Sequence, residues 1–140
     1  MNSTKLLLDI NYGNYSCKGA SNIEMNILGN FLAIDVGCLY VTSYKEWALA
    51  DKEDPNSQFI YSYSADATYL EEENNYIYLE EDISSGEETP PRLKITKKQF
   101  VQLLDDWQEL VCKTKPKEVI IKHEHGHFFI ETSDVKWEKQ

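Results

Sequence analysis

The clearest pattern of apolar and polar positions lies between residues 97 and 112. Its apolar members fall three or four positions apart and would line one face of a helix: Phe100, Leu103, Leu104, Trp107, Leu110 and Val111. Thr96, followed three positions later by Gln99, forms a capping box at the start of this segment. Pro116 blocks a longer helix. The pattern predicts a main helix over about 97–112.

Shorter segments carry one of two strand signals: an alternation of apolar and polar residues, as at 6–10 and 75–82, or a run rich in β-branched or aromatic residues, as at 118–122. They cover residues 6–10, 57–64, 75–82, 92–95, 118–122 and 127–132. Residues 23–27 and 31–36 show similar patterns around Gly29-Asn30, a pair that suits a two-residue hairpin turn, so we expect a β-hairpin over 23–36. Residues 38–51 begin with strand formers and continue with helix formers, so a second helix near 44–51 is the alternative to a further strand.

No linker or repeat divides the chain, so residues 1–140 are expected to form a single α+β domain. An antiparallel β-sheet of about five to seven strands would pack against the 97–112 helix, because a sheet with one apolar face needs a second layer to cover it. Residues 83–92 are polar and contain Gly86 and two prolines, which predicts an exposed, mobile loop.

Composition fits a folded protein that remains in the compartment where it is made. The chain is 41% apolar and 12% aromatic, which is too apolar for a disordered protein. No apolar run approaches the roughly 20 residues that a membrane-spanning helix needs, and Asp9 interrupts the first apolar stretch before it could form a signal-peptide core. Cys17, Cys38 and Cys112 form an odd set without close pairs, which argues against a disulfide framework and predicts three buried thiols in a reducing cytosol. We expect a cytoplasmic protein without membrane contact.

Charge is distributed unevenly along the chain, whose net charge is −10. Residues 1–88 hold 16 acids and 4 lysines, whereas residues 89–140 hold 8 acids and 10 bases. The segment 71–88 alone carries eight acids and no base. Such a field repels nucleic acid and attracts basic proteins. Direct binding to nucleic acid is therefore not expected.

All three histidines lie within 123–127, where His123-Glu124-His125-Gly126-His127 matches the H-E-x-x-H signature of zinc proteases letter by letter. That signature needs a helix, which places residues i and i+4 on one face. Gly126 weakens a helix by roughly 1 kcal/mol relative to alanine, and strand-like apolar runs flank the motif. The interpretation is a polar hairpin tip, with His123 and His127 near each other across the turn. Three imidazoles could then hold a metal loosely, so a metal-dependent hydrolase that uses His123, His125 and His127 stays an alternative.

Other catalytic patterns do not occur in the sequence. It contains no G-x-S-x-G motif, no glycine-rich phosphate loop and no G-x-G-x-x-G motif. The expectation is a protein that is not an enzyme and that uses no cofactor and no metal.

The segment 71–88 interleaves acids with tyrosines and is the strongest candidate for a binding surface. Tyrosine offers a large contact area at low entropic cost, and surrounding acids steer a basic partner and speed association. The candidate partner-binding residues are Glu72, Glu73, Tyr76, Tyr78, Glu80, Glu81 and Asp82, with the two tyrosines as central anchors. The alternatives are a solvated edge strand whose charges only prevent aggregation, and an acidic DNA-mimic or adaptor protein.

The segment 92–131 contains an ordered set of elements: Thr96, the pattern F-x-x-L-L-x-x-W at 100–107, Lys115-Pro116, and a hairpin that ends in Ile130-Glu131. In these elements it resembles small bacterial immunity proteins of polymorphic-toxin systems, including contact-dependent growth inhibition. The resemblance covers about 40 of the 140 residues. It implies a cytoplasmic, non-enzymatic protein that binds and neutralises a cognate toxin, often a nuclease, and it carries over no interface residue.

Charge and resemblance together predict a nuclease inhibitor. Its partner would be a basic toxin domain, a ribonuclease or a deoxyribonuclease, because such a domain binds nucleic acid through lysines and arginines that an acidic protein can meet. The chain is expected to be a monomer that forms a 1:1 complex with this toxin domain.

Overall fold

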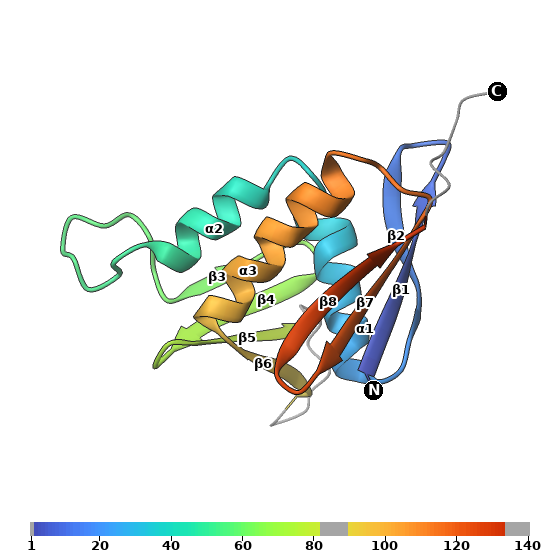
Figure 1. The fold of residues 1–140 in the computed structure, drawn as a ribbon. Coiled ribbons are helices and arrows are strands. Elements are labelled where there is room, and N and C mark those ends of the chain that lie inside the picture. The colour runs from blue at the N-terminus through green and yellow to red at the C-terminus, as the bar shows by residue number, and fades with distance from the viewer. Residues whose placement is uncertain (1, 82–89, 134–140) are drawn as a thin grey trace.

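The computed structural model describes residues 2–81 and 90–133 (Figure 1). The elements are β1 (Asn2–Asp9), β2 (Asn14–Ala20), α1 (Ile23–Asn30), η1 (Phe31–Val36), α2 (Val41–Leu49), β3 (Ser62–Ser64), β4 (Thr68–Glu73), β5 (Tyr76–Glu81), β6 (Arg92–Thr96), α3 (Lys97–Trp107), η2 (Gln108–Cys112), β7 (Glu118–Glu124) and β8 (His127–Thr132). The π-helical turns η1 and η2 continue α1 and α3 directly. In the described part of the chain no single helix is long and apolar enough to cross a membrane, although the bent pair Ile23–Val36 and Val41–Leu49 meets that test by length and composition.

The described strands form two antiparallel sheets of four strands each. The first has the order β2-β1-β7-β8 and the second the order β3-β4-β5-β6. The fold class is therefore α+β, as the sequence predicts, but the expectation of a single sheet of about five to seven strands is wrong. The first sheet pairs β1 with β7, and no local pattern reveals a pairing between segments so far apart in the chain. The segment 83–92, expected to be a mobile loop, lies largely outside the described residues.

Helices α1 and α3 connect the two sheets. Helix α1 contacts β1 and β2 of the first sheet and β5 and β6 of the second, and α3 contacts β8 as well as β5 and β6 (Figure 1). Side chains from both sheets enter the same core, among them Leu6 and Val119 from the first and Leu79 and Ile95 from the second. One hydrophobic core therefore joins both sheets.

The two helices expected from the sequence are confirmed. At the start of α3, Thr96 Oγ1 accepts the N–H of Gln99 at 3.0 Å, and Gln99 Oε1 accepts the N–H of Thr96 at 2.8 Å. The helix buries Phe100, Leu103, Leu104 and Trp107 of the predicted apolar face, and η2 continues it to Cys112. Val111 of that face is buried as well, whereas Leu110 is 43% exposed, so this one position of the expected face is wrong. Helix α2 lies where the second helix was expected, near 44–51.

The segment 23–36 is helical, so the β-hairpin expected there is wrong. Asn22 caps α1 by accepting the N–H of Met25 at 2.9 Å. Gly29 lies inside the helix, where a Cβ atom would sit 2.6 Å from Cys17 Sγ. Glycine is therefore needed for the close approach of α1 to β2 and not for a turn. Most apolar side chains of α1 and η1 are buried, so the segment lacks the polar face that identifies a helix in a sequence.

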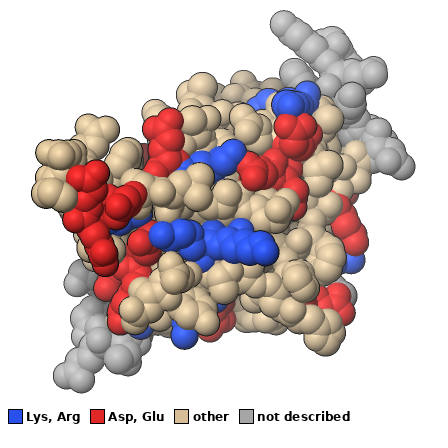
Figure 2. All heavy atoms as spheres, turned by 60° about the vertical axis from the view of Figure 1, so that its left-hand side comes forward, with Lys and Arg blue, Asp and Glu red and all other residues tan. Residues whose placement is uncertain are grey.

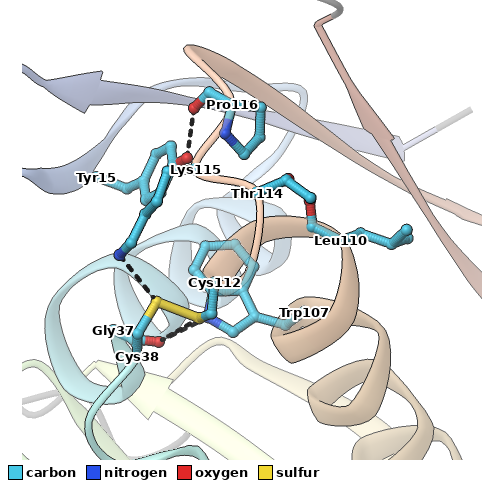
Figure 3. The surroundings of a disulfide bond; sticks show 9 residues. All are labelled: Tyr15, Gly37, Cys38, Trp107, Leu110, Cys112, Thr114, Lys115 and Pro116. Atoms are coloured by element: carbon cyan, nitrogen blue, oxygen red, sulfur yellow. Dashed lines mark hydrogen bonds between the residues drawn. A yellow bond between two sulfur atoms is a disulfide. The ribbon is translucent and has the colours of Figure 1, made fainter. Parts of the chain in front are cut away.

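Cys38 and Cys112 form a disulfide bond, with their Cα atoms 5.5 Å apart (Figure 3). The expectation of three unpaired cysteines is therefore wrong. The sequence could not reveal the pair, because 74 positions separate the two partners. Lys115 Nζ donates to Cys38 Sγ at 3.2 Å, and Cys17 is free and half-buried. Disulfides persist in oxidising surroundings, so the cysteines no longer favour a reducing compartment.

The disulfide predicts the number of reactive thiols. Protein purified without reductant and then unfolded should react with a thiol reagent at Cys17 alone, and reduced protein should react at all three cysteines. Added dithiothreitol should lower the free energy of unfolding by about 2–4 kcal/mol, because the cross-link restricts the unfolded chain. A double Cys38→Ser, Cys112→Ser variant is the control and should not respond to dithiothreitol. Three reactive thiols in the unreduced protein would contradict the pairing.

Asp35 is a buried acid in η1, only 6% exposed. Its Oδ1 accepts the N–H of Ala67 at 2.9 Å, while Oδ2 has no hydrogen-bond partner among the described residues. Burial raises the pKa of Asp35 above its ordinary value, and the nearby charge of Asp66 adds to this effect. The polar groups of Ala67, Thr68 and the Asp66 backbone offset only part of it. The folded chain thus binds a proton at Asp35 more tightly than the unfolded chain does. Stability from this group is present at low pH and is lost as the pH rises through the folded-state pKa.

The substitution Asp35→Asn should stabilise the protein at neutral pH, because it removes a buried charge and keeps the oxygen that accepts the Ala67 N–H. Urea unfolding between about pH 4 and pH 8 should also show a weaker fall in stability with rising pH than in the wild type. Asp106→Asn, on the surface of α3, is the matched control and should change neither quantity. A loss of stability at pH 7 in Asp35→Asn would show that the ionised carboxylate is required.

Candidate functional site

The candidate binding residues lie on the hairpin of β4 and β5. Its turn consists of Asn74 and Asn75, whose φ angles of 52° and 69° are the positive values that a tight hairpin turn needs. The register pairs Glu71 with Tyr78 and places Leu70 opposite Leu79. Because side chains alternate along a strand, the leucines enter the core, and the tyrosines at 76 and 78 point to the other side.

The outward side of the β3–β6 sheet forms a surface that we call the tyrosine face. Its members share the outward phase of β4, β5 and β6 and are exposed or half-buried: Tyr69, Glu71, Glu73, Tyr76, Tyr78, Glu80, Arg92 and Lys94. Strand β6 contributes its two cations to this side, where three acids and two bases leave it close to neutral. The tyrosine face is therefore aromatic and mixed in charge, and less acidic than the segment 71–88 suggested.

Cations from β6 lie directly on the tyrosine rings. The Arg92 guanidinium carbon lies 4.0 Å from the ring centroid of Tyr78, and Lys94 Nζ lies 4.3 Å from that of Tyr76. Arg92 Nη1 is also 3.9 Å from Glu80 Oε1. Such cation–π contacts are attractive by about 0.5–1 kcal/mol at exposed sites, so they favour the ring positions seen here.

The structure brings only some of the predicted residues together. Glu73, Tyr76, Tyr78 and Glu80 share the tyrosine face, and the Tyr76 side chain is 37% exposed. Glu72 points into the protein and is buried. Glu81 is exposed at the end of β5 but has the opposite phase, and Asp82 lies outside the described residues.

Glu72 belongs to a buried ion-pair cluster with Lys52 and Lys97. Its Oε1 lies 2.7 Å from Lys52 Nζ and its Oε2 lies 3.3 Å from Lys97 Nζ. The Lys52 side chain is 0% exposed, lies 4.8 Å from the Trp47 ring centroid and donates to the Trp47 carbonyl. The carboxylate of Glu72 is thus already neutralised inside the protein and is not available to a partner.

Lys52 is the residue that sequence reasoning missed. The sequence holds one signal for the cluster: Glu72 is in phase with Thr68 and Leu70, which are buried positions of β4. An acid in phase with buried neighbours requires a cation, but nothing local shows that Lys52, in a turn 20 positions earlier, supplies it.

The histidine segment is a hairpin tip, as the flanking strand patterns predict. His125 and Gly126 form the turn, with φ angles of 52° and 78°, between the paired strands β7 and β8. His123 pairs with Phe128 and stacks on it with ring centroids 4.3 Å apart, and burial lowers the pKa of His123. His127 pairs with Glu124, so His123 and His127 lie on opposite sides of the hairpin. The expectation that they are neighbours is wrong, and residues 2–81 and 90–133 contain no group of three possible ligands placed to hold a metal.

No protein-family model, curated protein or solved structure matches the chain. The similarity of the 92–131 segment to immunity proteins therefore stays a prediction from sequence elements, and the structure supplies the remaining arguments about function.

The buried ion-pair cluster predicts a difference between two adjacent acids. Glu72→Gln removes the main counter-charge of a fully buried ammonium group and should cost about 3–5 kcal/mol of unfolding free energy. Glu73→Gln, on the exposed side of the same strand, is the control and should stay within about 0.5 kcal/mol of the wild type. Urea denaturation measures the unfolding free energy of both variants. Equal midpoints would show that the Glu72 carboxylate does not stabilise the fold.

Proposed function

We propose that this chain is a non-enzymatic binding protein that neutralises a cognate secreted toxin domain by covering it with the tyrosine face. The observation that carries the proposal is the set of outward tyrosines whose rings are held by Arg92 and Lys94. Ordered aromatic side chains lose little entropy when a partner binds, and tyrosine is enriched at the centres of protein interfaces.

The overall charge supports a basic partner. The chain carries −10 at neutral pH, while the tyrosine face itself holds three acids and two bases. Charge would therefore act mainly on the rate of encounter, and the aromatic contact would determine how long the complex lasts. A nuclease toxin fits this division, because the cleft that binds nucleic acid is basic.

The resemblance of the 92–131 segment supports the role of an immunity protein of a polymorphic-toxin or contact-dependent growth inhibition system. In that role the protein acts as a monomer in a 1:1 complex in the bacterial cytoplasm. In the reducing cytosol Cys38 and Cys112 would be thiols, and their disulfide would form when the protein is exposed to air during purification without reductant. No observation favours the alternative of a hydrolase at His123, His125 and His127, whose first and last members lie on opposite sides of their hairpin.

The test begins with the gene beside the one that encodes this chain: we expect it to encode a large secreted protein, whose C-terminal domain is then coexpressed with this chain. We expect the chain to restore growth to cells that produce the toxin domain, and the purified proteins to elute as a 1:1 complex. Titration calorimetry then measures the dissociation constant of variants. Tyr78→Ala removes a central ring and should weaken binding by at least 2 kcal/mol, about 30-fold.

Tyr12→Ala is the matched control, since Tyr12 is 80% exposed in the turn between β1 and β2, away from the tyrosine face. It should bind the toxin domain like the wild type, and both variants should show wild-type thermal unfolding within a few degrees. Absence of both complex and protection would overturn the proposed function. If Tyr78→Ala and Tyr12→Ala weaken toxin binding equally, the tyrosine face is not the interface.

A further inference from the structure

Two hollows meet at the end of the second sheet where the β4–β5 turn approaches α3. One has a volume of about 720 Å³ and the other about 660 Å³, and both are lined by Leu49, Asn74, Asn75 and Lys97. Shared walls make them two halves of one groove, which we call the docking groove. It runs between the end of α2, the β4–β5 turn and the first turns of α3, next to the tyrosine face.

One half of the docking groove is mainly apolar. Its walls include Leu49, Tyr76 and Val101, and Leu49 is 63% exposed. The acid in this half, Asp105, already forms an ion pair with Lys45. An apolar side chain of a partner could therefore be buried against Leu49 and Val101, which is favourable because it removes apolar surface from water. The acid in this half would not oppose it, since Asp105 is already paired.

The other half is acidic. Its walls include Asp51, Glu53, Glu73 and Tyr61, and within residues 2–81 and 90–133 no lysine or arginine lies within ion-pair distance of the first three. Figure 2 shows acidic side chains gathered at one edge of this side of the molecule, beside a short basic band. Three acids in this wall thus have no ion-pair partner among the described residues.

The lysines in the walls offset only part of this charge, because Lys52 and Lys97 share one carboxylate and leave a single positive charge against the three other acids. Lys52 and Lys97 flank the carboxylate of Glu72. The negative field reaches the aromatic wall as well: partial burial and then the charges of Glu53, Glu72 and Asp51 raise the pKa of the Tyr61 hydroxyl. A cation in this half would be attracted by the acids and could lie against the Tyr61 ring.

An anionic ligand does not suit the groove, although the N-terminus of α3 lies in its wall. The capping box already uses the N–H of Gln99, and Lys97 donates its N–H to the Asn75 carbonyl at 2.8 Å. The helix end is therefore partly satisfied from within the chain. Lys98, exposed at the margin of the apolar half, repels a cation from that half and so gives the groove a direction.

We infer that the docking groove receives a segment of the toxin domain in which lysine or arginine stands beside a large apolar residue. The cation enters the acidic half, between Glu53, Glu73 and Tyr61, and the apolar side chain packs on Leu49 and Val101. This inference rests on the proposed function for the identity of the partner, but the groove's preference for basic and apolar side chains is testable without it.

The probe is a short capped peptide, Gly-Lys-Arg-Gly-Leu-Phe-Gly, titrated into nitrogen-15-labelled protein and followed by NMR. We expect saturable shifts of the amides of Asn74, Asn75 and Lys98 at concentrations up to about 1 mM. Two control peptides replace Lys-Arg by Glu-Glu or Leu-Phe by Ser-Ser, and both should bind at least about tenfold more weakly, because each loses one half of the contacts. Equal binding of the acidic peptide, or shifts confined to other surfaces, would overturn the inference.

Matched charge reversals separate the groove from the net charge. The double variant Glu53→Lys, Glu73→Lys should weaken the basic peptide about tenfold, since two favourable charge contacts become repulsive. Glu109→Lys with Glu131→Lys changes the net charge equally, on η2 and β8, and should leave binding within about twofold. If both double variants weaken peptide binding equally, the effect comes from the net charge of the protein, and the docking groove is not the binding site.

The toxin complex distinguishes failure of the groove from failure of the proposed function. If Tyr78→Ala weakens the complex but Glu53→Lys, Glu73→Lys does not, and the peptide fails to bind, the groove is wrong and the function stands. If the toxin domain neither binds nor is neutralised, the proposed function fails, whatever the peptide does. Weakening of both toxin and peptide by the groove variant, with the charge control unchanged, supports the inference.

Discussion

Helices α1 and α3 carry apolar side chains that both four-stranded sheets need in order to bury their inner sides. Each sheet alone would expose one apolar side to water, and burial of such surface is the main force that favours folding. Gly29 lets α1 approach β2 closely enough for this contact, and Trp107 of α3 lies fully buried with its ring 5.8 Å from that of Tyr15. Trp107 also donates its Nε1–H to the Gly37 carbonyl at 2.7 Å (Figure 3). This shared core fixes which side of each sheet faces water.

The position of the tyrosine face follows from that core. Once Leu70, Ile77 and Leu79 are buried, the pleat of the sheet places Tyr76 and Tyr78 on the outer side. The antiparallel register of β5 and β6 then brings Lys94 opposite Tyr78 and Arg92 opposite Glu80. A surface of aromatic rings in contact with two cations is thus a consequence of strand pairing. The buried cluster of Lys52, Glu72 and Lys97 likewise shapes the docking groove, because it holds two lysines of the wall against one carboxylate.

Particular residues show how far the sequence predicted the structure. Helix α3 was predictable in position and capping, since its amphipathic pattern and the pair Thr96 and Gln99 are local signals. The β7–β8 hairpin was equally predictable, because Gly126 lies between two strand-like runs. Helix α1 was not, because a helix buried on most sides shows no polar face. In the candidate site, the prediction that Tyr76 and Tyr78 point away from the core was correct. The prediction that Glu72 is accessible to a partner was wrong, because Glu72 is buried and pairs with Lys52, which only the folded chain brings close to it.

The sequence by itself determined the elements whose causes are local: the capped α3 helix, the β5, β6, β7 and β8 strands, the excess of acids and the non-helical setting of the histidines. Only the tertiary structure decided the division into two sheets, the Cys38–Cys112 pair and the neutralisation of Glu72. It also decided that Arg92 and Lys94 lie on the tyrosines. The physical reason is distance along the chain: capping and periodicity act between residues a few positions apart, whereas sheet pairing, disulfides and buried ion pairs join residues whose proximity exists only after the core has formed.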